Sequence, residues 1–84
     1  MYYVYVLKSD KDGNLYVGYT KDLRNRFEEH NSGKSTSTRD RIPLRIIYYE
    51  ACENKYDARH REKYLKTSWG KRYIKNRLKN YLTG

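Results

Sequence analysis

Two tyrosine-containing triplets near the start of the chain carry the residue types best suited to chemistry. Tyr3-Val4-Tyr5 and Tyr16-Val17-Gly18 are separated by ten residues that include an Asp-Gly pair, which predicts a hairpin with a tight turn. In a two-residue hairpin, opposed residues share a face and their numbers add to an odd sum. Tyr5 and Tyr16 are therefore expected on the same face of the sheet. Two phenols on one face of a basic chain indicate a site for phosphate chemistry.

The first predicted helix carries two polar side chains on the stripe that should meet the sheet. Its apolar anchors are Leu23 and Phe27, and the same stripe extends to Arg26 and His30. Charges are rarely buried singly, so such residues are usually paired or bind ions. The alternative for Arg26 is an apolar stem with its head in water, and for His30 a hydrogen-bonded position at the helix end.

The second predicted helix repeats this pattern. Ala58, Leu65 and Trp69 are expected to form its inner stripe, and Glu62 falls within that stripe. The alternative for Glu62 is an ion pair with Lys66, four residues later. Each of these three polar residues on an apolar stripe, Arg26, His30 and Glu62, has an ordinary explanation by itself. Taken together, beside two tyrosines on one sheet face, they fit a functional site better.

These side chains match the needs of phosphodiester hydrolysis. Glu62 can hold a hard cation such as Mg²⁺ together with water and phosphate oxygens. Arg26 offers a planar fork that matches phosphate oxygens. A tyrosine flanked by cations, its pKa lowered by them, would act as general base. Gly18 has no side chain and is expected to leave room for a phosphate beside Tyr16.

The basic charge of the chain is concentrated in its last third. The net charge is +9, from 19 Lys and Arg against 10 Asp and Glu, and residues 59–79 hold nine basic residues and one acid. Such a run on helical segments indicates a polyanion partner, most often nucleic acid. A solvated face without a partner is the alternative. A membrane surface is disfavoured, because the basic helices lack a wide aliphatic face.

The 84 residues are expected to form one domain, residues 1–84. Strands are predicted at 2–9, 15–20 and 44–50, and helices at 20–32 and from 54 to about 66. A polar loop spans 34–43. After a break at Ser68-Trp69-Gly70, a last helix has apolar residues at helical spacing: Tyr73, Ile74, Leu78, Tyr81 and Leu82. The order β-β-α-β-α-α predicts an α+β fold, a small three-stranded and mostly antiparallel sheet flanked by helices.

Other classes find no support in the sequence. The longest apolar run, Tyr2 to Leu7, is too short for a membrane span or a signal-peptide core, so the expected compartment is the cytoplasm. Cys52 is the single cysteine and forms no zinc-ligand spacing with His30 and His60.

At these residues the chain resembles the GIY-YIG nuclease superfamily. The two triplets stand at the family's spacing, and Arg26, ten residues past Tyr16, matches the family's helix arginine. His30 matches a histidine of many members, and Glu62 matches the metal-binding glutamate. The resemblance covers roughly residues 2 to 82. It is strongest to small standalone members akin to the N-terminal catalytic domain of the excision-repair nuclease UvrC.

The resemblance implies a small α/β sandwich that cuts DNA with Mg²⁺ or Mn²⁺ and leaves a 5′-phosphate and a 3′-hydroxyl. It makes Tyr5, Tyr16, Arg26, His30 and Glu62 the candidate catalytic residues, with Glu62 as metal ligand. It also points to DNA repair or recombination.

The chain departs from the family pattern at three places. Tyr3 stands where the first triplet begins with Gly, and Tyr19 stands where some relatives have Lys. The family's late asparagine has Asn76 as its better-placed counterpart and Asn80 as the second. These departures bear on activity more than on the fold.

The leading hypothesis is a metal-dependent DNA endonuclease. A nucleic-acid-binding module without catalysis is the alternative, and a protein-interaction surface built from the tyrosines is a third interpretation. DNA is favoured over RNA, and a protein partner for targeting stays open. The residues expected to contact nucleic acid are basic or amide side chains, namely Lys34, Arg39, Arg59, Lys66, Lys71, Arg72 and Asn76.

Overall fold

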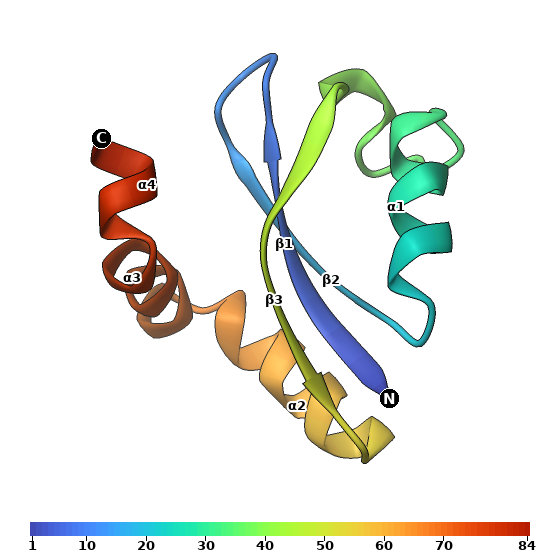
Figure 1. Ribbon diagram of the computed structural model, residues 1–84, viewed down its shortest axis with the longest axis vertical. Coiled ribbons are helices and arrows are strands. Elements are labelled where there is room, and N and C mark those ends of the chain that lie inside the picture. Colours follow the sequence, from blue (N-terminus) through green and yellow to red (C-terminus); the bar gives the residue numbers. More distant parts are fainter.

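The computed structural model describes residues 1–84 as a three-stranded antiparallel sheet with helices on both faces (Figure 1). Strands β1 (Tyr2–Ser9), β2 (Leu15–Thr20) and β3 (Leu44–Cys52) lie in the order β2-β1-β3. Helix α1 (Leu23–Asn31) covers one face. Helices α2 (Lys55–Leu65), α3 (Ser68–Arg77) and α4 (Lys79–Thr83) lie on the other. The predicted α+β class and the element order are confirmed.

The central strand β1 divides the interior into two clusters, because its side chains alternate between the faces. Val4 and Val6 pack with Ala58, Leu65 and Ile74 of the helices on one side. On the α1 side, the buried residues are Tyr5, Leu7 and Leu44, with Phe27 and Tyr16 packed against them. The fully buried side chains of the first face are therefore all aliphatic, with tyrosines packed around them, whereas the second face has a phenol among its fully buried side chains.

The hairpin between β1 and β2 is longer than the predicted two-residue turn. The Ser9 hydroxyl accepts hydrogen bonds from the N–H groups of Lys11 and Asp12 at 3.1 and 3.2 Å, and the Asp12 carboxylate accepts one from Asn14 N–H at 2.9 Å. These side-chain bonds stabilise a wider loop in place of a minimal turn. Gly13, with φ of 73°, supplies the left-handed residue that closes it.

The longer loop leaves the predicted pairing of the tyrosines intact. Tyr5 lies opposite Gly18, and Leu7 lies opposite Tyr16, so opposed numbers still add to an odd sum. The sheet's register irregularity falls between β1 and β3, after Val6, and does not disturb β2. The prediction that Tyr5 and Tyr16 share a face is therefore confirmed.

The helix starts follow the capping residues seen in the sequence. Asp22 caps α1 by accepting the Asn25 N–H at 3.1 Å, and Gly33, with φ of 81°, follows its end. Asn54 caps α2 by accepting the N–H of Tyr56 at 2.8 Å. None of the helices has the length and apolar character that crossing a membrane requires.

The predicted break between the two helices is present, but it lies at Lys66 and Thr67, and Ser68-Trp69-Gly70 form the first turn of α3. Thr67 caps this helix through its hydroxyl, which accepts the Gly70 N–H at 3.2 Å. Gly70 is needed for close packing on α2, since a Cβ there would lie 2.1 Å from the Tyr64 carbonyl oxygen.

Two further predictions about these helices also fail. Trp69 is not on an inner stripe: it is 65% exposed, with the Arg72 guanidinium 5.0 Å above its ring centroid. The predicted single last helix is two helices, α3 and α4, joined at Leu78.

Candidate active site

Tyr5 stands at the centre of the α1 face and is almost completely buried, with 1% of its surface exposed. Its ring crosses β2 at Gly18, where an added Cβ would lie 2.3 Å from the Tyr5 Cζ. The space above Gly18 therefore belongs to the Tyr5 ring. The expectation that Gly18 leaves room for a phosphate is wrong, because Tyr5 already fills that room.

His30 joins this ring from α1. Its Nε2 lies 2.9 Å from the Tyr5 hydroxyl, and its Nδ1 lies 2.6 Å from Thr38 Oγ1. The imidazole is fully buried and meets the edges of the Tyr5 and Tyr16 rings at centroid distances of 5.7 and 5.2 Å. Burial, aided by the charge of Arg26, lowers the pKa of His30 to about 4. His30 is therefore a neutral hydrogen-bonding residue near pH 7, inside the site as its helix stripe predicted.

Arg26 is half-buried beside the Tyr5 hydroxyl. Its guanidinium donates to Glu29 Oε1 at 3.1 Å and to Ser35 Oγ at 3.4 Å. Burial works to lower the pKa of Arg26, but hydrogen bonds to Glu29 and Tyr5 hold that pKa above its usual range. The guanidinium therefore stays charged at the edge of the site.

The predicted lowering of a tyrosine pKa does not occur at Tyr5. Burial raises the pKa of Tyr5 to about 12, and this outweighs the opposing effect of Arg26. The phenol therefore keeps its proton near pH 7. The neutral His30 imidazole donates one of its two hydrogen bonds, to Tyr5 or to Thr38, and accepts the other.

Tyr16 is the partly exposed phenol of the group. Its hydroxyl accepts a hydrogen bond from Ser37 Oγ at 3.4 Å, and Ser37 lies 3.1 Å from Ser35 Oγ. Ser35 in turn reaches Arg26 at 3.4 Å. A line of hydroxyls thus joins Tyr16 to the arginine around the outside of the site.

Sequence reasoning missed Ser35, Ser37 and Thr38, which it assigned to a polar loop. Ser35 and Thr38 are buried against the site, although the loop around them is exposed. The loop is fixed because the Asn31 side chain bonds both backbone groups of Leu44, at 2.7 and 2.8 Å. The four-residue run of hydroxyls from 35 to 38 was the only signal in the sequence.

Glu62 approaches from α2. Its carboxylate, 22% exposed, forms a 3.0 Å ion pair with Lys66, which is the alternative that the helix spacing offered. Its charge is among the causes that raise the Tyr5 pKa, so it acts electrostatically on the tyrosine cluster. The structure therefore brings Tyr5, Tyr16, Arg26 and His30 together directly. Glu62 lies apart from them on α2, where it lines a separate hollow with Tyr56, Arg59, His60 and Lys63.

Known proteins resemble this chain over most of its length. The family model described as the GIY-YIG catalytic domain matches residues 1–81. This chain belongs to the GIY-YIG family. The match covers both triplets and the residues of α1 and α2 that complete the cluster.

Relatives of this GIY-YIG chain carry the name UPF0213 protein. One from Clostridium perfringens is 46% identical over 67 residues, which cover 79% of this chain and 71% of the relative. One from Staphylococcus saprophyticus is 40% identical over 67 residues, covering 79% and 80%. The solution NMR structure of a UPF0213 protein from Bacillus halodurans has 36% identity and a TM-score of 0.54, covering 88% of this chain and 82% of that one.

The residues predicted to contact nucleic acid lie at several separate places on the GIY-YIG domain. Lys34 and Arg39 are exposed in the loop after α1. The Arg59 guanidinium lies over the Tyr19 ring at 5.8 Å, and Lys71 is exposed on α3. Asn76 lines a hollow at the junction of α3 and α4, and no residue of the tyrosine cluster lines that hollow.

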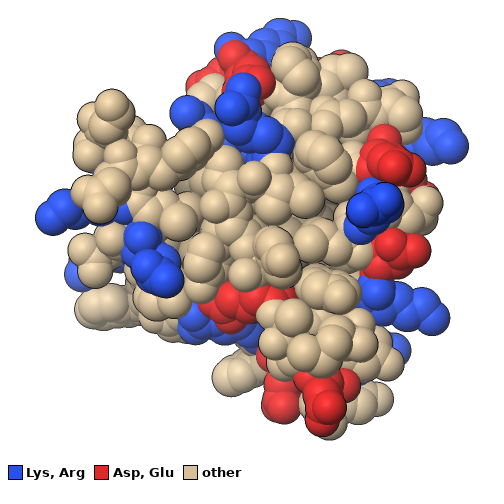
Figure 2. All heavy atoms as spheres, in the orientation of Figure 1, with Lys and Arg blue, Asp and Glu red and all other residues tan.

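Every Lys and Arg within residues 59–79 is exposed except Arg61. Arg61 is turned inward and donates to both Glu50 oxygens at 2.9 Å. On the face in Figure 2, Lys and Arg stand apart from one another and alternate with acidic groups along one edge. On that face the basic residues therefore form no continuous stripe.

Proposed function

We propose that this GIY-YIG chain is a metal-dependent endonuclease that hydrolyses DNA phosphodiester bonds. The main support is the line of contacts in which Arg26 lies against Tyr5, Tyr5 bonds His30, and His30 bonds Thr38. Burying a histidine and a phenol is unfavourable unless every polar atom finds a partner, and here each does. Such an arrangement is well suited to holding the Arg26 guanidinium and the Tyr5 phenol in fixed positions.

The proposal divides the work between the two tyrosines. Tyr16 is partly exposed, so its hydroxyl can meet a substrate and act as general base toward water. Tyr5 is covered, so it acts as a positioning residue that holds Arg26 and His30. Arg26 then places its guanidinium against the phosphate oxygens that gain charge as water attacks.

A divalent cation fits the acid that the site offers. No cluster of three His, Cys, Asp or Glu side chains exists, so Glu62 would hold Mg²⁺ or Mn²⁺ with water and substrate phosphate as the other ligands. When bound, such an ion neutralises charge that develops on phosphate oxygens. Lys66 now occupies the Glu62 carboxylate at 3.0 Å, so it must move aside when a cation binds.

The biological setting is also part of this proposal. The resemblance to the catalytic domain of UvrC suggests a role in DNA repair or recombination. DNA is the proposed substrate, because the family resemblance points to DNA cleavage. The exposed basic residues of α2 and α3 would add salt-dependent binding to phosphates.

The test is a nuclease panel of nicked, branched and single-stranded DNA, incubated with and without Mg²⁺ or Mn²⁺. Wild type is expected to cut at least one substrate only with metal. Glu62→Gln, which keeps the shape and removes the charge, should abolish cutting while binding stays within a few-fold. Glu53→Gln, at an exposed acid outside the cluster, is the matched control and should cut normally.

Two results would contradict the proposal. If Glu62→Gln cuts at the wild-type rate, Glu62 is only the partner of Lys66. If wild type binds every DNA tightly and cuts none, the chain is a nucleic-acid-binding module, the alternative interpretation.

A further inference from the structure

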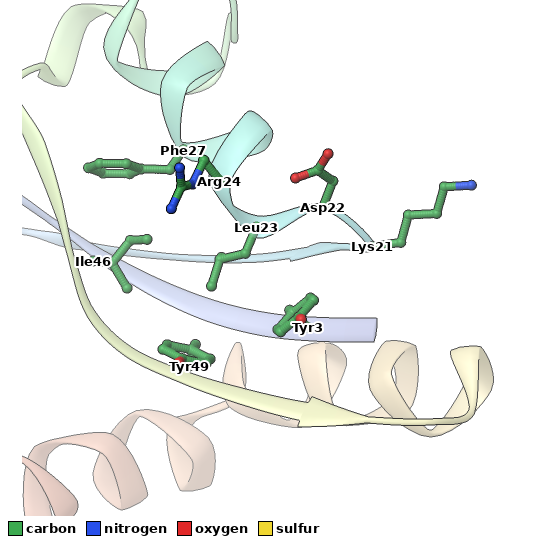
Figure 3. Close-up of a pocket in the computed structure, with 8 residues that line it drawn as sticks. All are labelled: Tyr3, Lys21, Asp22, Leu23, Arg24, Phe27, Ile46 and Tyr49. Atoms are coloured by element: carbon green, nitrogen blue, oxygen red, sulfur yellow. The ribbon is translucent and has the colours of Figure 1, made fainter. Parts of the chain in front are cut away.

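The α1 face of the sheet holds an open hollow of about 700 Å³ that the proposed reaction does not use. Figure 3 shows Leu23 and Phe27 projecting from α1 toward the sheet, where Tyr3 and Tyr49 lie on neighbouring strands. None of Tyr5, Tyr16, Arg26, His30 and Glu62 lines it. It is a separate feature with a mainly aromatic and aliphatic wall.

The hollow adjoins the tyrosine cluster along the strands and along α1. Tyr3 lies two residues before Tyr5 on the same face of β1, a separation of about 7 Å. Tyr49 stands opposite Tyr5 across the β1–β3 pair. Leu23 begins the helix stripe that continues to Arg26 one turn later. A bound strand with one phosphate at the cluster would therefore place an adjoining nucleotide at the hollow.

Part of the aromatic wall is open to solvent. Tyr49 is 55% exposed, and its ring meets Tyr3 at a centroid distance of 6.1 Å and an interplanar angle of 60°. Neither hydroxyl bonds another group of the protein, so these phenols serve no internal hydrogen-bond network. Exposed aromatic rings beside a charged site are the surfaces on which nucleic-acid bases stack.

The charges at the rim favour a nucleotide over an uncharged apolar ligand. Lys21 and Arg24 line the hollow, are exposed, and form no ion pair. The single acid at the rim, Asp22, is committed to the Asn25 N–H as the helix cap. In Figure 3, Lys21 extends outward from the hollow. Two unpaired cations at the rim of an aromatic hollow match a base with its phosphates.

We propose that this hollow binds one unpaired nucleobase of the substrate strand, stacked against Tyr49. The identity of the ligand rests on the proposed action on nucleic acid. A base held in a duplex already has its faces covered by its neighbours, so the site takes bases from single strands, frayed ends or flaps. It therefore gives the domain a preference for substrates with an unpaired nucleotide next to the phosphate that it cuts.

The experiment is a binding cycle carried out in EDTA, so that no cleavage occurs. Two probes are compared: a thymine oligonucleotide of about twelve nucleotides, and an abasic oligomer with the same number of phosphates. Wild type should bind the thymine strand more tightly. Tyr49→Ala should reduce that preference by about 5- to 150-fold while its affinity for the abasic strand stays the same.

Two variants keep the result specific to the ring. Tyr49→Phe should keep the preference for the thymine strand, because stacking does not use the hydroxyl. It also keeps the packing of the ring, so it can be measured even if the alanine variant folds poorly. Tyr56→Ala removes a tyrosine that is 75% exposed on α2, outside the hollow, and should keep the preference. An undiminished base preference in folded Tyr49→Ala, or none in wild type, overturns the inference.

The cycle also separates this inference from the proposed nuclease function. If the base preference depends on Tyr49 but no substrate in the nuclease panel is cut, the stacking site is supported and the nuclease function is rejected. If wild type cuts DNA but shows no base preference, only the stacking proposal is rejected.

Discussion

The two faces of the same three-stranded sheet are built from opposite kinds of chemistry. The face under α2 and α3 buries Val4, Val6, Leu65 and Ile74, which have no polar side-chain atom. The face under α1 buries Tyr5 together with His30, Ser35 and Thr38. Adjacent residues of one strand, such as Val4 and Tyr5, therefore belong to different environments, because strand side chains alternate.

The difference shows how such a short chain can carry a polar site. Hydrocarbon burial on one face drives folding and needs no particular geometry. Polar burial on the α1 face is tolerated only because every buried donor and acceptor is paired. The paired hydrogen bonds on the α1 face therefore hold its polar side chains in defined positions, as catalysis requires. Substitutions of the buried aliphatic residues should therefore affect stability, whereas substitutions in the tyrosine cluster should affect activity.

The largest expected effect compares tyrosines from the two faces. Tyr16→Phe should reduce turnover by about 10²–10⁴-fold, the usual loss when a general base is removed. Tyr2→Phe should change turnover little, because Tyr2 packs toward the α2–α3 face and stacks on Tyr19 at 6.3 Å. Both variants keep the ring and so keep most packing. Initial cleavage rates with Mg²⁺ measure the effect. Equal and small losses in both variants would show that the Tyr16 hydroxyl takes no part in the reaction.

A second pair of variants fills the close-packed glycine of each face. Gly70→Ala should lower the free energy of unfolding by about 3 kcal/mol, because its Cβ would meet the Tyr64 backbone at 2.1 Å. Gly18→Ala should lower it by about 1–2 kcal/mol, because the Tyr5 ring can tilt away from a Cβ at 2.3 Å. That tilt breaks the bond to His30, so the folded variant should cut poorly.

Urea unfolding and cleavage per folded molecule check this pair. A Gly70→Ala variant that keeps wild-type stability but does not cut DNA would contradict the prediction. Gly18→Ala with normal cleavage would show that the position of Tyr5 is unimportant.

Buried His30 predicts a pH dependence that belongs to the α1 face alone. Its pKa is about 4 when folded and 6.5 when unfolded, so below pH 6.5 the unfolded chain binds a proton that the folded chain refuses. Stability should therefore fall as pH drops from about 6.5 toward 4, with a slope approaching about 1.4 kcal/mol per pH unit. His30→Gln should remove this slope between pH 6.5 and 5. Denaturant midpoints at a series of pH values measure it, and parallel curves for both proteins would contradict it.

Much of the fold followed from local signals. Strand alternation placed Tyr5 and Tyr16 on one face despite the longer hairpin loop, because widening the loop preserved the register. Side-chain caps at Asp22 and Asn54 gave two helix starts. These features depend on neighbours in the sequence, so short-range patterns are sufficient to find them.

The errors arose where long-range packing decides. Gly70 was interpreted as a break, but contact with α2 requires it inside a helix. Trp69 was expected inside, although its helix directs it to solvent. The raised pKa of Tyr5 follows from burial, and the role of Thr38 follows from a loop anchored at Leu44 by Asn31. No pattern along the chain encodes these distances.

The smallest expected effect asks whether the α2–α3 face also meets DNA. Lys71 is exposed on α3, and it lines a hollow with Lys75 and Arg41. If Lys71 neutralises one phosphate, Lys71→Ala should lower the slope of log K against log salt by about 0.7–0.9 and weaken binding about five-fold at 0.1 M salt. Asn76→Ala on the same helix removes no charge, so it should leave the slope unchanged. Salt titrations of binding in EDTA measure both slopes. An unchanged slope for Lys71→Ala would show that Lys71 contacts no phosphate, because the loss of one phosphate contact must lower the slope.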